Sequence, residues 1–398
     1  MAASNSGFPA IRLLRRRRRG QSPAGVTALI IAARVARPCA AAPGRLGAPL
    51  CLCLLLGFCP PRTVAQWFPP PLREKTGKLR ASGYAQLRYT AIDETEDRYA
   101  LRRLKLFLGG DLSRDWQWFA QGFFQDGNNS PTDGRVYFQE GWLRYRRFRS
   151  AQFVFGQMKP SFGRERFTPD FEIYTINRSV VVRTLIPAGE FSGSFARDLG
   201  AQVDGTLGRS FRYATGVFGG SGVKRPVHGI GPMITSRVTY DAIPSRRVLG
   251  RDFRLNAGAA VSVRQAKDLS FGSLGCIETR RRLERFRGQD RRVGLEAAAG
   301  WDDLSLRAEY LRATFDFADG SAPISADGYY VELGKYASRK WQAVAKIEEF
   351  DPNSRLENDK DLRWLTLGLN YYIRGDHRLK VMANYVFRWE RTQERPND

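Results

Sequence analysis

Apolar and polar side chains alternate along most of the chain after position 66. Within 78–90, one set of alternate positions holds Leu79, Ala81, Gly83, Ala85, Leu87 and Tyr89, and the other holds Lys78, Arg80, Ser82, Tyr84, Gln86 and Arg88. A β-strand sends successive side chains to opposite faces, whereas a helix repeats every 3.6 residues. The alternation therefore predicts strands with one lipid-compatible face and one wet, basic face.

Similar runs recur down to the end of the chain. They are residues 78–90, 98–112, 115–126, 135–146, 150–158, 196–206, 211–220, 231–241, 252–264, 290–301, 303–316, 327–338, 340–350, 362–374 and 378–390. Strands of about 10 residues cross a bilayer when they are tilted, and transmembrane barrels alternate apolar-out with polar-in. The pattern predicts an all-β fold, an antiparallel transmembrane β-barrel in which these runs are the strands.

Aromatic residues and connection lengths fit the same fold. Many runs open or close with an aromatic residue, namely Trp116, Trp118, Trp142, Tyr145, Trp301, Tyr329, Tyr330, Trp341, Trp364 and Trp389. We expect these side chains to form girdles at the membrane interfaces. The links 113–114 and 337–340 are predicted to be periplasmic turns, and the polar stretches 127–134, 265–289 and 351–361 are predicted to be external loops.

The charge balance bears on the solute. The chain has 64 Lys+Arg against 40 Asp+Glu, a formal charge of +24, and residues 66–398 stay basic without the ten arginines of residues 1–65. Such a balance suits an anionic solute or nucleic acid. Because the basic side chains alternate with apolar ones along many strands and no recognised binding motif is present, we expect no nucleic-acid partner.

The chain has few residues for metal binding or catalysis. Cys276 is the only cysteine after residue 65, and His228 and His377 are the only histidines. This inventory argues against a disulfide framework, a metal site or cofactor and histidine-based catalysis, so we do not expect an enzyme.

The start of the chain has the features of an exported precursor. An apolar stretch at 46–58 follows Arg45 and precedes Thr63-Val64-Ala65, which fits a cleavage site of the A-x-A type. We therefore predict an N-terminal extension and signal peptide at 1–65, a Pro-rich lead-in at 66–77 and a barrel at 78–398. The predicted location is the outer membrane of a Gram-negative bacterium, where the outer face of the barrel contacts lipid.

Three segments carry a family resemblance. They are RRLKLFLGGDLSRDWQW from Arg102, GQMKPSFGRERFT from Gly156, and NRS at Asn177–Ser179 followed by ARDLG at Ala196–Gly200. With these motifs the chain resembles the phosphate-selective porin O and P family. The resemblance implies a 16-stranded barrel, commonly a homotrimer, with an inward loop at 159–195 that narrows the channel, and basic side chains that guide inorganic phosphate or other small anions.

The resemblance also assigns site residues. It implies a central anion site of Arg102, Arg103 and Arg166, with Lys159 and Arg164 as further constriction residues. Parity along the strands predicts further basic residues of the lumen, which are Arg80, Arg88, Lys105, Arg254, Arg264, Arg292, Arg307, Arg374, Lys380 and Arg388. Consecutive strand residues face opposite ways, so Arg102 and Arg103 both point inward only if a bulge or loop end intervenes, and parity favours Arg103.

The chain departs from the family pattern at several positions. Arg166 stands where strongly phosphate-selective members have Lys, Tyr84 stands where such a member has Arg, and Asn177 replaces the usual Glu. Anion preference is therefore expected more firmly than phosphate selectivity. The family also ends on a strand with a terminal aromatic residue, whereas this chain ends in ERPND, so a last strand is expected to be missing.

Three alternatives stay open at this point. The same barrel suits general or organic-anion diffusion, or a structural outer-membrane protein that does not conduct. A nucleic-acid-binding protein is the third alternative, and salt-dependent DNA binding by a water-soluble form would favour it.

Overall fold

The computed structural model describes residues 32–38, 46–57, 79–91, 98–126, 136–187, 196–222, 231–248, 250–269, 283, 286–355 and 361–390. The predictions for the lead-in 66–77, the loop 127–134, His228 and Cys276 lie outside the described residues.

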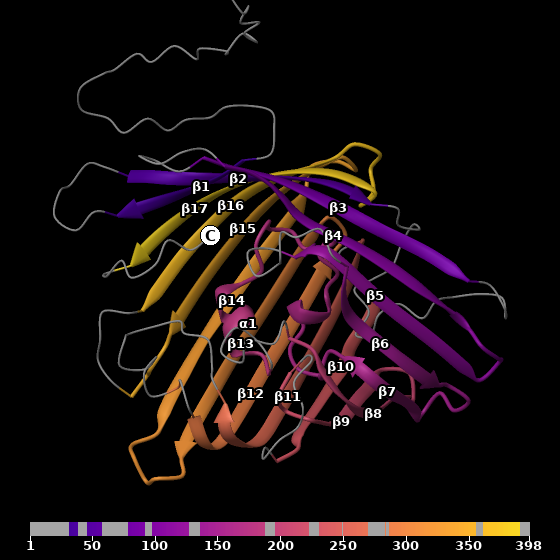
Figure 1. The fold of residues 1–398 in the computed structure, drawn as a ribbon. Helices are drawn as coiled ribbons and strands as arrows, with labels where there is room; N and C mark the ends of the chain where they lie inside the picture. The colour runs from indigo at the N-terminus through magenta and orange to yellow at the C-terminus, as the bar shows by residue number, and fades with distance from the viewer. Residues whose placement is uncertain are drawn as a thin grey trace, which may run out of the picture.

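The described chain is built almost entirely of strands (Figure 1). After residue 79 they are β3 (Arg80–Ala91), β4 (Arg98–Asp111), β5 (Trp116–Asp126), β6 (Tyr137–Tyr145), β7 (Gln152–Met158), β8 (Asp198–Leu207), β9 (Phe211–Phe218), β10 (Met233–Val248), β11 (Arg251–Leu269), β12 (Phe286–Trp301), β13 (Leu304–Phe317), β14 (Ile324–Tyr336), β15 (Trp341–Asp351), β16 (Leu362–Tyr372) and β17 (Leu379–Glu390). Each pairs antiparallel with the next in one sheet, so the predicted fold class is confirmed.

Each predicted run overlaps one of these strands, and some strands are longer than predicted. The ladder between β11 and β12 continues through Gln265↔Gln289 and Ala266↔Gly288 to Leu269↔Phe286. Residues 265–269 and 286–289 were predicted to lie in a loop because they are polar. Their backbone groups continue the ladder, which satisfies hydrogen bonds whatever the side chains are.

The two faces of the sheet differ as the alternation predicts. On β4, Leu106 and Leu108 are 46% and 44% exposed on the outer face, whereas Lys105 is 3% exposed on the face that encloses the central space. We call this inner side the luminal face. Apolar side chains outside and polar side chains inside are the arrangement that lipid on one side and water on the other require.

The predicted aromatic girdles are only partly present. The pairs Trp116–Tyr145 and Trp341–Tyr371 have ring centroids 5.1 and 4.5 Å apart beside the short turns, and both tryptophans are exposed. Trp142, Trp364 and Tyr330 are instead buried, so their assignment to girdles is wrong. Their positions in the alternation place them on the luminal face, where Trp142 stacks on Phe119.

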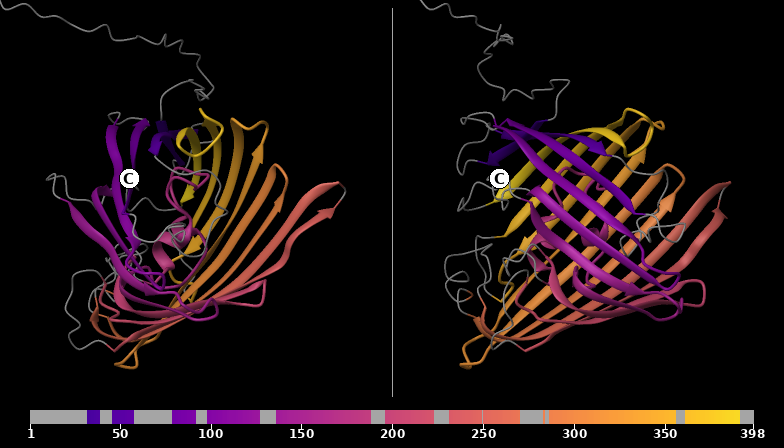
Figure 2. Two further views of the ribbon diagram at one scale, coloured as in Figure 1. Left: turned by 90° about the vertical axis from the view of Figure 1, so that its right-hand side faces the viewer. Right: turned by 45° about the vertical axis from the view of Figure 1, so that its right-hand side comes forward.

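The sheet is not closed by a ladder between its first and last long strands. Among the described residues, β3 and β17 do not pair with each other, and β1 (Ala32–Pro38) and β2 (Leu46–Gly57) lie between them (Figure 2). Strand β2 meets β17 at Leu379↔Leu56 and β3 at Gly57↔Tyr84. These two strands fall within the predicted N-terminal extension and signal peptide, which stays a prediction.

The connection between β7 and β8 folds into the central space enclosed by the strands (Figure 1). We call the described residues of this connection, 159–187 and 196–197, the inward loop. It contains the 3-10 helix η2 (Glu165–Phe167) and the helix α1 (Val180–Leu185). Ser179 is the N-cap of α1, and its Oγ accepts a 3.2 Å hydrogen bond from the Val181 N–H. Neither of these helices, nor any other helix in the described ranges, has the length and apolar content to cross a membrane.

The inward loop is fixed by an apolar core on one side of the lumen. Val181 and Leu185 of α1 are fully buried and belong to the same cluster as Leu311, Tyr330 and Phe350 of β13, β14 and β15. Burying a side chain of this size contributes about 1.5–3 kcal/mol. The core places the polar part of the loop toward β3 and β4.

Candidate functional site

A β-bulge brings two consecutive arginines to the luminal face of β4. Gln86 pairs with Arg103 and Leu87 pairs with Leu101, so Arg102 is the extra residue in the ladder. Arg102 and Arg103 are 7% and 8% exposed. Because a bulge redirects the side chain at the insertion, both guanidinium groups reach the inward loop, which regular strand geometry does not allow.

One carboxylate of the inward loop meets the basic residues of β4. The Asp170 Oδ2 lies 3.9 Å from Arg103 Nε and 3.2 Å from Lys105 Nζ, and Asp170 Oδ1 lies 2.8 Å from Arg178 Nη2. The Tyr84 hydroxyl donates to Asp170 Oδ2 at 2.6 Å. Burial alone raises the pKa of Asp170, but the charges of Arg103, Lys105 and Arg178 hold it well below its usual range.

Arg102 joins a second part of the loop. Its Nη2 donates to Asn177 Oδ1 at 3.3 Å, and the carbonyl oxygen of Asn177 accepts from Lys346 Nζ on β15 at 3.2 Å. The loop therefore bridges β4 and β15 across the lumen. Basic side chains from both walls converge on it.

Arg166 is held by the backbone of the loop. Its Nη1 donates to the carbonyl oxygen of Pro187 at 2.9 Å and its Nη2 donates to the carbonyl oxygen of Ala196. Lys159 Nζ in turn donates to the carbonyl oxygen of Arg166 at 3.2 Å, and burial lowers the pKa of Lys159 to about 7. These contacts fasten the two ends of the loop, and Arg166 is 3% exposed.

Carboxylates on the opposite wall hold the loop by its backbone. Glu309 on β13 accepts hydrogen bonds from the N–H groups of Arg164 at 2.7 Å and Glu165 at 2.5 Å, and Glu348 on β15 accepts from the Val180 N–H at 2.8 Å. Sequence reasoning missed these residues because it searched for basic ones. The alternation pattern could have identified them, because it places an acidic residue at a luminal position on each of four consecutive strands: Glu296, Glu309, Glu332 and Glu348.

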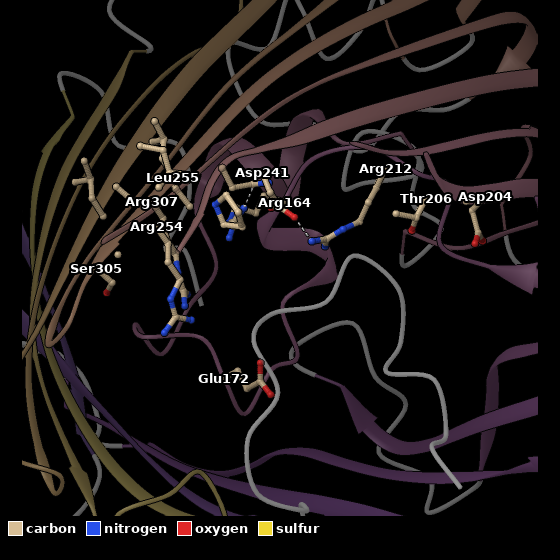
Figure 3. A pocket seen from close by; sticks show the side chains of 18 of the residues that line it. Arg164, Glu172, Asp204, Thr206, Arg212, Asp241, Arg254, Leu255, Ser305 and Arg307 are labelled. Carbon is tan, nitrogen blue, oxygen red and sulfur yellow. Dashed lines mark hydrogen bonds and ion pairs between the residues drawn. The ribbon is translucent and has the colours of Figure 1, made fainter. Parts of the chain in front are cut away.

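A cavity lies below the loop, at the end of the sheet with the short turns. Its volume is about 840 Å³. The charged residues that line it are Arg144, Arg146, Arg149, Arg164, Arg212, Arg254, Arg307, Glu172, Asp204 and Asp241. Arg164, Arg212 and Arg254 enter from different elements, and Glu172 lies apart from them across the cavity (Figure 3).

The arginines of the cavity differ in their partners. Arg144 lies 2.9 Å from Asp204, and Arg212 pairs with Asp241. Arg164 Nη1 donates to the neutral Asn256 Oδ1 at 2.8 Å, and Arg254 is exposed to the cavity. The net field in the cavity is therefore positive. The sequence assigned Arg164 to the constriction, and the structure places it where the loop borders this cavity.

The remaining predicted lumen residues fall into two groups. The first group lies on the luminal face and has partners there: Arg264 and Arg292 pair with Asp290 at 2.5 and 2.8 Å, and Arg307 pairs with Glu332 at 3.7 Å. In the same group, Lys380 donates to the Ile173 carbonyl oxygen at 2.8 Å, and Arg388 lies 4.3 Å from the centre of the Trp364 ring. Arg80 lies 3.7 Å from Asp111 near the turns, and Arg88 is half-buried on β3. Arg374 is exposed in the turn after β16, because that strand ends at Tyr372.

Comparison with known proteins identifies relatives by sequence. The family model of phosphate-selective porin O and P matches residues 78–235 and 278–398. The curated protein Porin O of Pseudomonas aeruginosa is 25% identical over 355 residues, which are 75% of this chain and 78% of that protein.

Comparison with solved structures concerns the fold. An anion-selective porin from Comamonas acidovorans matches with a TM-score of 0.51 and 12% identity over 78% of this chain and 99% of that one. The trimer form of OmpT from Vibrio cholerae matches with a TM-score of 0.50 and 11% identity over 79% of this chain and 100% of that one. At these identities the likeness bears on the barrel fold alone.

Proposed function

This chain belongs to the phosphate-selective porin O and P family and is an outer-membrane porin of the Gram-negative type, and from that premise we propose that it passes small anions, inorganic phosphate among them, by passive diffusion. The family is one of channels, not of enzymes. The proposed path runs through the lumen beside the inward loop.

The cavity under the loop is the observation that carries this proposal. Seven arginines and three carboxylates line its volume of about 840 Å³. Arg254 projects into it, and Arg164 binds there to a neutral amide. A cleft with an excess of one sign of charge raises the local concentration of the opposite ion, so the excess of arginines here is expected to concentrate anions next to the constriction.

The basic residues of β4 supply the next step of the path. An anion that enters a narrow pore loses hydration, and guanidinium and ammonium groups replace that hydration with charge-assisted hydrogen bonds. Arg102, Arg103 and Lys105 line the loop side of the lumen at a few per cent exposure. No energy source acts on such a path, so the gradient of the solute sets the direction of flow.

General or organic-anion diffusion is a second candidate, which the size of the cavity favours. Volumes of about 300–1,000 Å³ are typical of sites that hold organic ligands, and this cavity lies within that range. Conductance block by phosphate at low concentration distinguishes a phosphate-preferring pore from this alternative. A carboxylate solute that blocks more strongly than phosphate favours the alternative.

The assembly and export of the chain follow from the same proposal. The outer face exposes apolar side chains, which suit contact with lipid or with neighbouring copies, and the OmpT that is similar in fold is a trimer form, so a homotrimer is proposed here. Residues 1–65 are proposed to act as extension and signal peptide, and residues 78–398 are proposed to form the barrel domain.

The zero-current potential across a KCl gradient tests the proposal directly. The chain is purified from the outer membrane of a Gram-negative host and inserted in planar bilayers. A potential near the chloride value supports an anion-preferring pore. A potential near zero or of cation sign contradicts anion preference, and insertion without current favours a non-conducting structural protein.

A further inference from the structure

The carboxylate of Asp170 occupies the place where an anion is expected to bind. Its two oxygens receive the Tyr84 hydroxyl at 2.6 Å, Arg178 Nη2 at 2.8 Å and Lys105 Nζ at 3.2 Å, and Arg103 Nε lies 3.9 Å away. These donors come from β3, β4 and the loop. Converging guanidinium, ammonium and hydroxyl donors form the environment that a bound oxyanion requires.

We propose that Asp170 is a built-in competitor for the central anion site, so that its carboxylate keeps the affinity of the open pore for phosphate low. The proposal rests on the proposed function of an anion-preferring porin and identifies a specificity-determining residue within it. A passing oxyanion has to share the donors of Tyr84, Lys105 and Arg178 with a fixed negative charge at contact distance.

The exposure of Asp170 supports a role in competition as well as in structure. Its side chain is 13% exposed, whereas Asp290, which pairs with Arg264 and Arg292, is 3% exposed. Solute in the lumen therefore reaches the Asp170 cluster. A Coulomb interaction between two like charges in contact is unfavourable at any dielectric constant of the pore, so the carboxylate repels an anion at the point where the donors attract it.

The position of the carboxylate is fixed by the loop. The Gln86 Nε2 donates to the carbonyl oxygen of Asp170 at 3.4 Å, and Arg178 Nη2 also donates to the carbonyl oxygen of Thr168 at 2.5 Å. Asp170 therefore keeps its position while anions bind and dissociate. A fixed competitor lowers affinity and shortens residence, which suits rapid permeation because a pore has to release what it binds.

The test measures phosphate block of chloride current in planar bilayers for the full chain and three variants. Asp170→Asn keeps the size of the side chain and removes its charge. Asp170→Glu keeps the charge, and Asp290→Asn removes a luminal carboxylate elsewhere, which pairs with Arg264 and Arg292 and does not line the cavity. We expect Asp170→Asn to lower the half-blocking phosphate concentration by about tenfold or more, the range of one charge-assisted hydrogen bond.

The other two variants are expected to stay within about twofold of the unmodified chain, which is less than one neutral hydrogen bond contributes. Equal gains in Asp170→Asn and Asp290→Asn overturn the proposal, because luminal net charge then explains the effect. A gain in Asp170→Glu overturns it as well, because loop shape is then responsible. A merely structural role of Asp170 predicts lower stability without tighter phosphate block.

The failure of the proposed function has a different signature. An unmodified chain without anion preference contradicts the proposed function, whereas tight block confined to Asp170→Asn still supports the role of Asp170. An anion-preferring chain whose block Asp170→Asn leaves unchanged contradicts the role of Asp170 alone. Should Asp170→Asn not insert, Asp170→Ser replaces it and the same outcomes decide.

Discussion

Glu309 on β13 accepts a hydrogen bond of 2.7 Å from the backbone N–H of Arg164, and this contact ties the inward loop to the barrel wall. The same carboxylate accepts from the Glu165 N–H at 2.5 Å and from the Tyr330 hydroxyl at 2.8 Å. Three donors, two of them in buried hydrogen bonds, therefore depend on one side chain.

Glu309→Ala is expected to destabilise the protein by about 3 kcal/mol, because each buried donor left without a partner costs about 1–3 kcal/mol. Urea unfolding in detergent, followed by tryptophan fluorescence, measures the change. Glu349→Ala is the control, since Glu349 pairs with Arg363 on an exposed part of the surface and such pairs contribute about 0–1 kcal/mol. Equal losses for the two variants would contradict the anchoring role.

Arg166→Ala is expected to lower stability and to leave ion selectivity nearly unchanged. The guanidinium donates to the carbonyl oxygens of Pro187 and Ala196 within the loop, so its loss leaves buried acceptors unpaired. Limited proteolysis of the loop and the zero-current potential measure the two effects separately. A large fall in anion preference with unchanged stability would instead support a direct role of Arg166 in the central anion site.

Arg254→Ala is expected to reduce the chloride-to-potassium permeability ratio. One charge at about 8 Å in water contributes about 0.5 kcal/mol, which is about twofold. Arg291→Ala is the matched control, because it removes the same charge from an exposed pair with Asp316. If the control changes the ratio as much as Arg254→Ala does, the cavity has no special part in selectivity.

Anion preference is expected to fall as pH rises through about 7. Burial lowers the pKa of Lys159 to about 7, and burial raises the pKa of Glu165 to about 7. Both groups lose a proton over the same range, so the loop loses positive charge and gains negative charge. Zero-current potentials at acidic, neutral and alkaline pH measure this. Glu165→Gln removes one of the two contributions and is expected to weaken the dependence.

The same two groups set a dependence of stability on pH. The folded pKa of Glu165 lies above its ordinary 4.5, so its contribution is present below 4.5 and is lost as pH rises through about 7. The folded pKa of Lys159 lies below its ordinary 10.5, so the unfolded chain holds more protons between about 7 and 10.5 and stability rises with pH there. Unfolding at pH 5, 7 and 9 is expected to show lowest stability near neutrality, and a maximum there would contradict both assignments.

Alternation along the chain predicts the strands because lipid and water impose opposite demands on the two faces. On β16, Leu367 and Leu369 face outward while Thr366 and Asn370 are buried inside, as their order in the sequence requires. The prediction that Trp364 lies in an aromatic girdle was wrong because it rested on residue type, whereas the alternation of positions along β16 places this side chain on the luminal face. Aromatic residues also pack inside the lumen, where Trp364 lies under Arg388.

The site was less predictable because its contacts join distant parts of the chain. Arg102 faces inward because one extra residue enters the ladder with β3, and its own sequence carries no sign of that register. The partner of Arg103, Lys105 and Arg178 is Asp170, an acidic residue in a loop with an excess of basic residues. A search for anion-binding residues passes over such a residue, although it occupies the centre of the cluster.

The core around α1 has an electrical consequence. Moving the helix exposes Val180, Val181, Val182 and Leu185, all buried, at a cost of about 1.5–3 kcal/mol for each side chain. A potential of about 100 mV does work of about 2.3 kcal/mol on one charge that crosses the whole membrane. The applied field is therefore too weak to swing the loop, so we expect the aperture to keep its width over the range of potentials that the cell envelope experiences.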